Sequence, residues 1–100
     1  VAKAALEASV KYLSVDLGNK NIRVNAISAG PMRTLAGAAI ANARDVYNYT
    51  RLNSALKRNT ELQEIGNTAL YLVSDLSNSV TGEIQFVDCG FNIIGMPQNK

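Results

Sequence analysis

Apolar positions recur at helical spacing through residues 1–17, and this pattern predicts a helix over that range. The helix has one stripe of large apolar residues and a second stripe of mostly small ones. We therefore expect two of its sides to be covered, one by a sheet and one by a close neighbour. Gly18 is expected to end the helix in the left-handed conformation. The large stripe consists of Leu6, Val10, Leu13 and Leu17, and the small one of Ala2, Ala5, Ser9 and Tyr12.

A short apolar segment, residues 22–27, has the composition of a β-strand. It is followed by a Gly-Pro turn, predicted as a loop over residues 28–34. A weaker helical pattern covers residues 36–47, and residues 48–58 are interpreted as a connector.

The motif Thr-Glu-Leu-Gln at residues 60–63 predicts a capping box, in which Thr60 accepts from a first-turn amide and Gln63 reaches back. The helix that it starts is expected to end in the polar residues 77–79. Thr81 and Gly82 then turn the chain into a second strand, residues 83–87, which the sequence Asp-Cys-Gly closes. The apolar stripe of this helix consists of Leu62, Ile65, Ala69, Leu72 and Leu76.

Two strands joined through a helix are expected to be parallel, with a right-handed crossover. A parallel sheet is covered on both faces, which two strands cannot achieve alone. The fold class predicted is therefore α/β, the C-terminal part of a doubly wound parallel sheet with flanking helices. Either the remaining strands precede Val1 or a partner supplies them.

Composition and charge exclude several functions. The net charge of +2 and the scattered basic residues give no stripe for nucleic acid. No apolar run approaches the ~18 residues of a membrane span, and no signal peptide is expected at the N-terminus. The absence of histidine excludes histidine triads and most zinc sites, so no metal site is predicted. A single cysteine, Cys89, allows no internal disulfide and fits a reducing cytosol.

Several segments together resemble a known family. Residues 1–8, VAKAALEA, look like the helix that carries the active-site lysine of short-chain dehydrogenases/reductases. Residues 23–36, RVNAISAGPMRTLA, are similar within that superfamily to the NADH-dependent enoyl-acyl carrier protein reductases of FabI type. Residues 67–76 and 80–88 also resemble that family. The resemblance implies that residues 1–100 are the C-terminal portion of a single dinucleotide-binding (Rossmann-type) reductase domain, whose nucleotide-loop half lies upstream.

The resemblance also implies a reaction, the reduction of trans-2-enoyl-acyl carrier protein to acyl-acyl carrier protein with NADH. This is the final reductive step of type II fatty-acid elongation. The family's tyrosine stands before the lysine in the pattern Tyr-x6-Lys, which falls before Val1, so the chain alone is expected to be inactive. The intact enzyme is expected to be a homotetramer in the bacterial cytoplasm.

In this family Lys3 is the catalytic candidate, because its ammonium can hold the nicotinamide ribose and bias the nearby tyrosine. The alternative is a solvated lysine paired with Glu7. The loop would wrap the nicotinamide: Met32 offers backbone groups to the carboxamide, Thr34 a hydroxyl to the pyrophosphate, and Gly30 a close backbone approach. The implied cofactor-binding residues are Lys3, Gly30, Pro31, Met32, Arg33, Thr34, Leu35 and Ala36, and the acyl pocket comprises Ala36, Ile40, Ala43 and Val46.

Each of these assignments has a plainer alternative: an ordinary strand-to-helix loop for residues 30–36, and core packing for the acyl-pocket residues. We interpret Tyr47 and Tyr49 as packing residues and Cys89 as a buried small hydrophobe. Arg23 and Asn25 are interpreted as structural hydrogen-bonding residues. Two other functions stay open: another short-chain reductase such as a ketoacyl reductase, for which Tyr-x3-Lys would speak, and a non-catalytic oligomerisation fragment.

Overall fold

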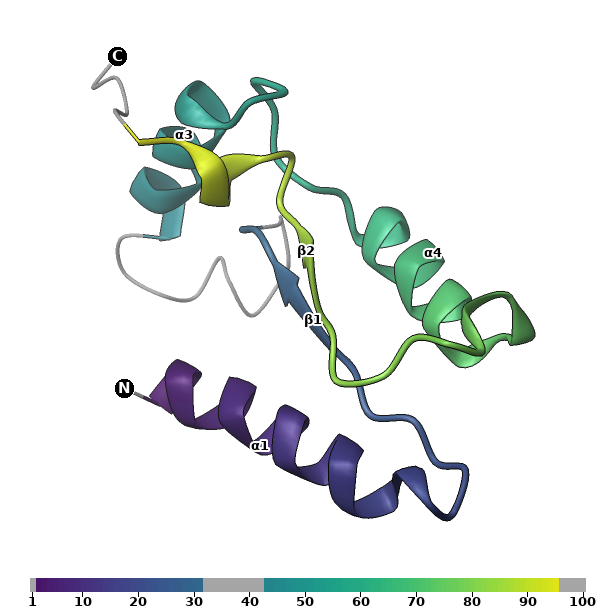
Figure 1. Ribbon diagram of the computed structural model, residues 1–100. Helices are drawn as coiled ribbons and strands as arrows, with labels where there is room; N and C mark the ends of the chain where they lie inside the picture. The colour runs from purple at the N-terminus through teal and green to yellow at the C-terminus, as the bar shows by residue number, and fades with distance from the viewer. Residues whose placement is uncertain (1, 32–42, 96–100) are drawn as a thin grey trace. The chain divides into compact units, whose positions relative to one another are not determined.

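The computed structural model describes residues 2–31 and 43–95, except for the side chains at 2, 3, 43 and 44 (Figure 1). The chain divides into two compact units, each described by itself below. Unit 1 comprises Val1–Ile27 and Thr68–Gln85, and unit 2 comprises Ser28–Asn67 and Phe86–Lys100. The described elements are α1 (Ala2–Gly18), β1 (Ala26–Ala29), α3 (Ala43–Asn53), α4 (Leu62–Val73), the 3₁₀ turn Asp75–Ser77, β2 (Ile84–Val87) and the 3₁₀ turn Phe91–Ile93.

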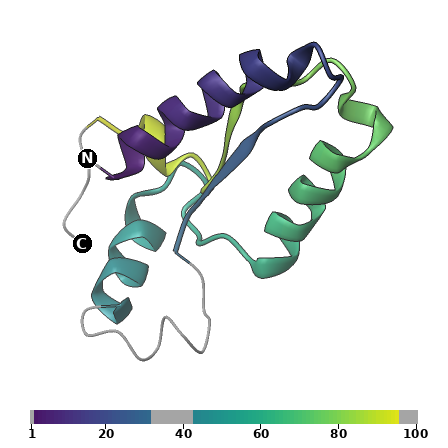
Figure 2. The same cartoon turned by 90° about the horizontal axis from the view of Figure 1, so that it is seen from below.

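The strands β1 and β2 pair in parallel, which confirms the predicted fold class (Figures 1 and 2). The Ala26 amide donates to the Glu83 carbonyl at 2.9 Å, and the Gly30 amide donates to the Val87 carbonyl at 3.1 Å. The two donors are four residues apart and so are the two acceptors, in the same chain direction, as in a parallel ladder. The second strand lies where the sequence predicts it.

The predicted bounds of the first strand are wrong at both ends, because β1 is Ala26–Ala29 rather than residues 22–27. Ahead of β1 the partners are side chains and a turn. The Val24 amide donates to the Thr81 hydroxyl at 3.1 Å, and its carbonyl accepts from the Gly82 amide at 2.8 Å. Apolar composition marks an extended segment, but it does not reveal where the backbone ladder starts.

In unit 1, α1 lies against the turn that precedes β2. Val10 and Ser14 are its buried residues. A Cβ at Gly82 would come within 2.9 Å of the Ser14 hydroxyl, and Gly82 has a φ of +71°, so glycine is required there twice over. The Lys11 ammonium donates to the Gly82 carbonyl at 3.3 Å. The helix is therefore fixed by its middle turns.

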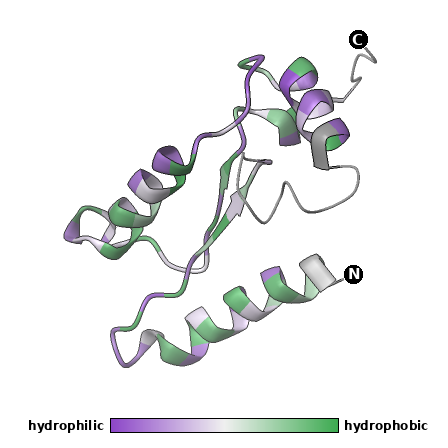
Figure 3. Cartoon of the chain, turned by 180° about the vertical axis from the view of Figure 1, so that it is seen from behind, coloured by the Kyte–Doolittle hydropathy of each residue, from purple (hydrophilic) through white to green (hydrophobic). Residues whose placement is uncertain are grey.

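The predicted large stripe of α1 is only partly buried in unit 1. Leu6 and Leu13 are exposed, and so is Tyr12 from the small stripe. Apolar residues are also exposed on α4. Figure 3 shows how hydrophobic residues, in green, are distributed along both helices. Leu72 is the buried apolar residue of α4, whereas Leu62 and Leu76 of the predicted stripe are exposed. Among the described residues, no helix is long and apolar enough to cross a membrane.

Two predicted helix ends are corrected by the structure. Gly18 is the last residue of α1, but the left-handed residue is Asn21, with φ 60° in the turn that follows. The α4 helix ends at Val73 rather than at residues 77–79. Ser74 then caps the 3₁₀ turn Asp75–Ser77 by accepting from the Leu76 amide at 3.3 Å. A serine hydroxyl competes with the helical bonds and so permits an earlier end.

One of the two bonds of a capping box is present at the start of α4, one residue later than predicted. The Glu64 carboxylate reaches back to the Glu61 amide at 2.9 Å, which makes Glu61 and Glu64 the pair, not Thr60 and Gln63. The Thr60 hydroxyl instead donates to the Val87 carbonyl at 3.0 Å. A tertiary contact therefore takes the side chain that the local pattern assigned to the cap.

In unit 2, the predicted connector over residues 48–58 is wrong in its first half, since α3 continues to Asn53. Five polar residues in the second half of α3 and in the connector after it are buried, whereas residues 55–58 are exposed. The Ser54 hydroxyl donates to the Arg58 carbonyl at 2.9 Å and accepts from the Arg58 amide at 3.1 Å, which closes a tight loop. Thr50, Asn53, Ser54, Asn59 and Thr60 form this buried polar group.

Candidate functional site

The carboxyl end of β1 in unit 2 is a close-packed turn at Gly30. A Cβ on Gly30 would lie 3.1 Å from the Asp88 Cβ and 3.2 Å from both the Asp88 Cα and the Thr60 Oγ1. Such distances are tighter than ordinary van der Waals contact, so only glycine lets β1 approach Asp88 this closely. The close approach predicted for Gly30 is thus made to the protein itself. Its approach to a cofactor stays a prediction.

The Val87 carbonyl is the centre of this arrangement. It accepts from the Gly30 amide at 3.1 Å and from the Thr60 hydroxyl at 3.0 Å. One carbonyl has two lone pairs, and both are used here. The ends of the two strands and the residue preceding α4's cap are therefore held at one point.

Beyond Val87 the chain turns sharply through two residues in the left-handed conformation, Cys89 (φ 57°) and Gly90 (φ 85°). The Asp88 carboxylate stabilises this turn by accepting from the Gly90 and Asn92 amides, both at 3.1 Å. A Cβ on Gly90 would lie 2.6 Å from the Ala55 Cβ, which leaves no space for a side chain. These two amides compensate part of the Asp88 charge, and both belong to the turn itself.

Cys89 differs from its predicted role as a buried small hydrophobe. It is only half-buried, and its Sγ lies 3.8 Å from the Thr60 Oγ1. Its carbonyl accepts from the Leu56 amide at 3.0 Å, which ties the turn to the connector after α3. Sequence reasoning did not identify Thr60 or Asp88 as part of this site. An aspartate followed by residues that tolerate positive φ was the available signal.

The α3 helix lies in the same unit and carries Val46, a predicted acyl-pocket residue. Val46 is exposed, and its role in an acyl pocket stays a prediction. On this helix Tyr49 packs edge-to-face on Phe91 with ring centroids 6.1 Å apart, which confirms its interpretation as a packing residue. Tyr47 is half-buried.

Most of the other predicted site residues lie outside the described residues. This applies to Met32, Arg33, Thr34, Leu35, Ala36 and Ile40. Lys3 and Ala43 lie in α1 and α3, but their side chains are not described. The structure therefore brings together Gly30 and Pro31, both half-buried, and places Val46 in the same unit.

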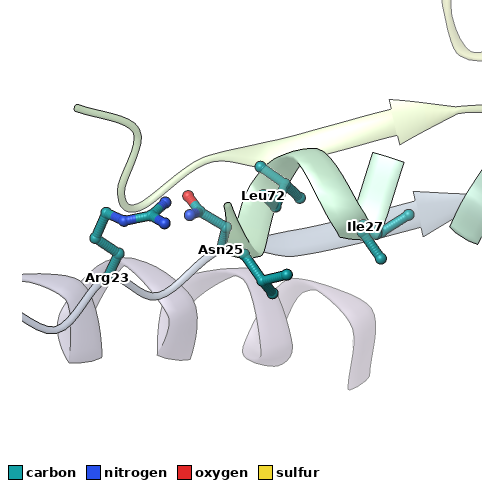
Figure 4. A pocket seen from close by; sticks show the side chains of 6 residues that line it. Arg23, Asn25, Ile27 and Leu72 are labelled. Atoms are coloured by element: carbon teal, nitrogen blue, oxygen red, sulfur yellow. The ribbon is translucent and has the colours of Figure 1, made fainter. Parts of the chain in front are cut away.

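A pocket of about 320 Å³ lies in unit 1 between β1 and α4 (Figure 4). Arg23 at one end donates to Ser77 Oγ at 3.0 Å and to the Val80 and Ser74 carbonyls at 3.2 and 3.3 Å. Asn25 donates to the same Val80 carbonyl and accepts from the Glu83 amide, both at 3.0 Å. The predicted structural role of Arg23 and Asn25 is confirmed. The remaining lining is apolar: Ile27, Ala69, Leu72 and Val73.

The described charged groups near the start of α4 form one ion pair. The Arg58 guanidinium donates to both oxygens of Glu64, at 3.0 and 2.9 Å. These hydrogen bonds, together with the one from the Glu61 amide, lower the pKa of Glu64 from 4.5 to about 2. The same pairing raises the pKa of Arg58. Among the described residues no cluster of histidine, cysteine, aspartate and glutamate could hold a metal ion.

A parallel strand pair joined through a helix, with small residues at its carboxyl end, is the arrangement of doubly wound α/β proteins, which bind ligands at that edge. The chain belongs to the enoyl-(acyl carrier protein) reductase family, whose sequence model matches residues 1–92.

Two relatives illustrate the similarity. An NADH-type enoyl-[acyl-carrier-protein] reductase of Rhizobium meliloti is 60% identical over 97 residues, which are 97% of this chain and 36% of the relative. The FabI of Rickettsia typhi is 58% identical over 95 residues, 95% of this chain and 36% of that protein. The chain thus spans about a third of the length of the curated relatives it matches.

Solved structures are similar over the same range. The crystal structure of FabI from Candidatus Liberibacter asiaticus has a TM-score of 0.90 and 63% identity, covering 97% of this chain and 38% of that one. The enoyl-(acyl-carrier-protein) reductase of Anaplasma phagocytophilum, solved in complex with NAD, has a TM-score of 0.87 and 52% identity, covering 97% and 35%.

Proposed function

We propose that the protein containing this chain reduces trans-2-enoyl-acyl carrier protein to acyl-acyl carrier protein with NADH, the last reduction of each fatty-acid elongation cycle. The observation that carries the proposal is the family match, which runs through the Gly30 turn and α3. The NADH-type names of the relatives and the NAD complex of one neighbour support the cofactor.

The described residues at the carboxyl end of β1 support the proposal of a dinucleotide site there. Ala29, Gly30 and Pro31 present small or flat surfaces there. The nearby Asp88 carboxylate accepts from two backbone amides, which compensate part of its negative charge. Rigid backbone held at the Val87 carbonyl gives such a ligand a fixed wall.

When bound, NADH supplies the hydride that goes to the β-carbon of the enoyl thioester. Lys3 holds the ribose hydroxyls and Met32 the carboxamide, while Thr34 donates to the pyrophosphate. Arg33, Leu35 and Ala36 complete the loop around the cofactor. A tyrosine from outside these residues stabilises the enolate oxygen.

The acyl chain lies against the apolar residues assigned to the acyl pocket, where hydrocarbon excludes water from the hydride transfer. The carrier protein brings the substrate. We also propose that the intact enzyme is a homotetramer and lies in the cytoplasm. The single cysteine of the chain supports only the cytoplasmic location. The residues assigned to the acyl chain are Ala36, Ile40, Ala43 and Val46.

The test is NADH oxidation by the full-length protein with crotonyl thioester, with acetoacetyl thioester in a parallel assay. Oxidation with the crotonyl substrate supports the proposal. Oxidation with the acetoacetyl substrate alone would make the protein a ketoacyl reductase, and no oxidation by a folded, NADH-binding protein would also contradict the proposal.

The role of Lys3 is tested by Lys3→Ala, with Lys20→Ala as the matched control, since Lys20 is an exposed lysine just after α1. Loss of a charged hydrogen bond to the ribose is expected to lower kcat/KM for NADH roughly 10- to 100-fold. The control is expected to behave like the unmodified protein. Equal kinetics for the two variants would contradict the assignment.

A further inference from the structure

The side chain of Asn59 is a buried polar link between α3 and the residues that precede α4. It is 7% exposed. Its Nδ2 donates to the Tyr47 carbonyl at 2.8 Å, across 12 residues of sequence. Because Tyr47 lies in the first half of α3, directly after Val46, this bond holds the helix near the proposed acyl-pocket residue.

The residue after Asn59 is anchored at the other end of the unit. The Thr60 hydroxyl donates to the Val87 carbonyl at 3.0 Å, and Val87 also receives the Gly30 amide. Thr60 is itself buried. The dipeptide 59–60 thus joins α3 to the carboxyl ends of both strands, where the cofactor is proposed to bind.

The other half of the amide shows that the donor is what matters. Asn59 Oδ1 is buried and has no hydrogen-bond partner among the described residues. Turning the amide over would place this oxygen against the Tyr47 carbonyl, and two acceptors repel. A buried acceptor without a partner is unfavourable, so the bond to Tyr47 must compensate for it.

We propose that Asn59 is a positioning residue, which sets α3 relative to the strand ends and thereby determines the affinity for the acyl chain. It touches neither substrate nor cofactor in this role. The inference rests on the proposed function, in which α3 lines the acyl pocket. Its effect is therefore on the enoyl substrate and not on NADH.

The first variant is Asn59→Ala in the full-length protein, with Asn48→Ala as control, since Asn48 is an exposed asparagine on α3. Alanine removes the unpartnered oxygen together with the donor, which limits the loss of stability. Loss of one neutral hydrogen bond is expected to raise KM for crotonyl thioester roughly 3- to 10-fold. KM for NADH is expected to stay unchanged, as are both constants in the control. An unchanged crotonyl KM, or an equal rise in both KM values, would overturn the proposal.

A second variant, Asn59→Asp, keeps the shape of the side chain but removes the donor while the carboxyl is ionised. The protonated carboxyl donates through its O–H, and burial is expected to raise its pKa. Of the charged groups beside it, Arg58 donates to the Asn59 carbonyl at 3.3 Å and is paired with Glu64. Relative to the unmodified enzyme, the crotonyl KM of this variant is expected to fall as the pH is lowered. The ratio of the crotonyl KM of Asn59→Asp to that of the unmodified enzyme should therefore depend on pH, whereas the ratio for Asn59→Ala should not. A pH-independent ratio for Asn59→Asp would overturn the proposal, and this test remains if Asn59→Ala does not fold.

Amide hydrogen exchange separates this inference from the proposed function. The α3 amides are expected to exchange faster in Asn59→Ala than in Asn48→Ala and in the unmodified protein. If the unmodified protein does not reduce enoyl thioesters, the proposed function fails while faster α3 exchange still supports the link. Equal exchange in all three proteins would overturn the link itself.

Discussion

Replacing Gly30 by alanine tests whether the end of β1 is as tightly packed as the structure indicates. The new Cβ would lie 3.1 Å from the Asp88 Cβ and 3.2 Å from the Asp88 Cα. Asp88 is held in place by hydrogen bonds on both sides. The carbonyl of the preceding residue, Val87, accepts two of them, and the Asp88 carboxylate accepts two more. The contact must therefore be relieved by shifting backbone.

The size of the effect follows from two opposing terms. Inserting a methyl group into a packed site costs about 1–3 kcal/mol. Alanine also lowers the conformational entropy of the unfolded chain. This stabilises the folded state by about 0.4–1 kcal/mol where alanine can adopt the native backbone conformation. Gly30 does not have a positive φ, so this second term applies. We expect Gly30→Ala to lower the free energy of unfolding by about 1–2 kcal/mol.

The assay is urea unfolding of the full-length protein, with Gly66→Ala as control. Gly66 lies inside α4, and a Cβ there would meet nothing within 4 Å. Alanine favours a helix interior over glycine by about 0.5–1 kcal/mol, so the control is expected to gain stability. If Gly30→Ala is as stable as the unmodified protein, the close packing of β1 on Asp88 is not real.

Three further substitutions test other parts of the structure. Gly90→Ala is expected to destabilise the protein more than Gly30→Ala, because the new Cβ would lie 2.6 Å from the Ala55 Cβ and the residue has a φ of +85°. Adding Ala55→Gly should restore part of the lost free energy of unfolding, measured with urea. No restoration would contradict the contact. Glu64→Gln should lower the urea midpoint at neutral pH. The difference in midpoint between the two proteins should shrink as the pH falls from 4.5 to about 2, because the ionised Glu64 carboxylate, whose pKa is lowered in the fold, stabilises the fold and its protonated form does not. A pH-independent difference would refute this. Arg23→Lys should lower the free energy of unfolding by about 1–3 kcal/mol, because a lysine ammonium cannot reproduce the hydrogen bonds that the two terminal nitrogens of Arg23 donate. An unchanged urea midpoint would contradict this role of Arg23.

The sequence predicts the order of elements and the parallel pairing because both depend on long-range features: apolar periodicity and the alternation of strand and helix. Single side chains are harder to place. Thr60 fits a cap by its spacing, yet its hydroxyl bonds to the Val87 carbonyl 27 residues away. Local patterns cannot weigh a cap against a tertiary acceptor that no neighbouring residue reveals.

The buried polar residues after α3 were missed for a related reason. Asn53, Ser54 and Asn59 suggest a solvated connector by composition, yet the structure buries each of them with a backbone partner. Burial of polar groups is favourable only when such partners exist, and the partners are set by the fold. Gly30, in contrast, could be identified as a point of close backbone approach, because glycine has no side chain to prevent it.

The most direct measurement follows the hydride. The full-length protein is incubated with crotonyl thioester and NADH deuterated at the transferable C4 position, and the product is examined by mass spectrometry. The account predicts a saturated butyryl thioester with deuterium at the β-carbon and a solvent proton at the α-carbon. Deuterium that stays in the dinucleotide, with no deuterated butyryl thioester formed, would contradict it.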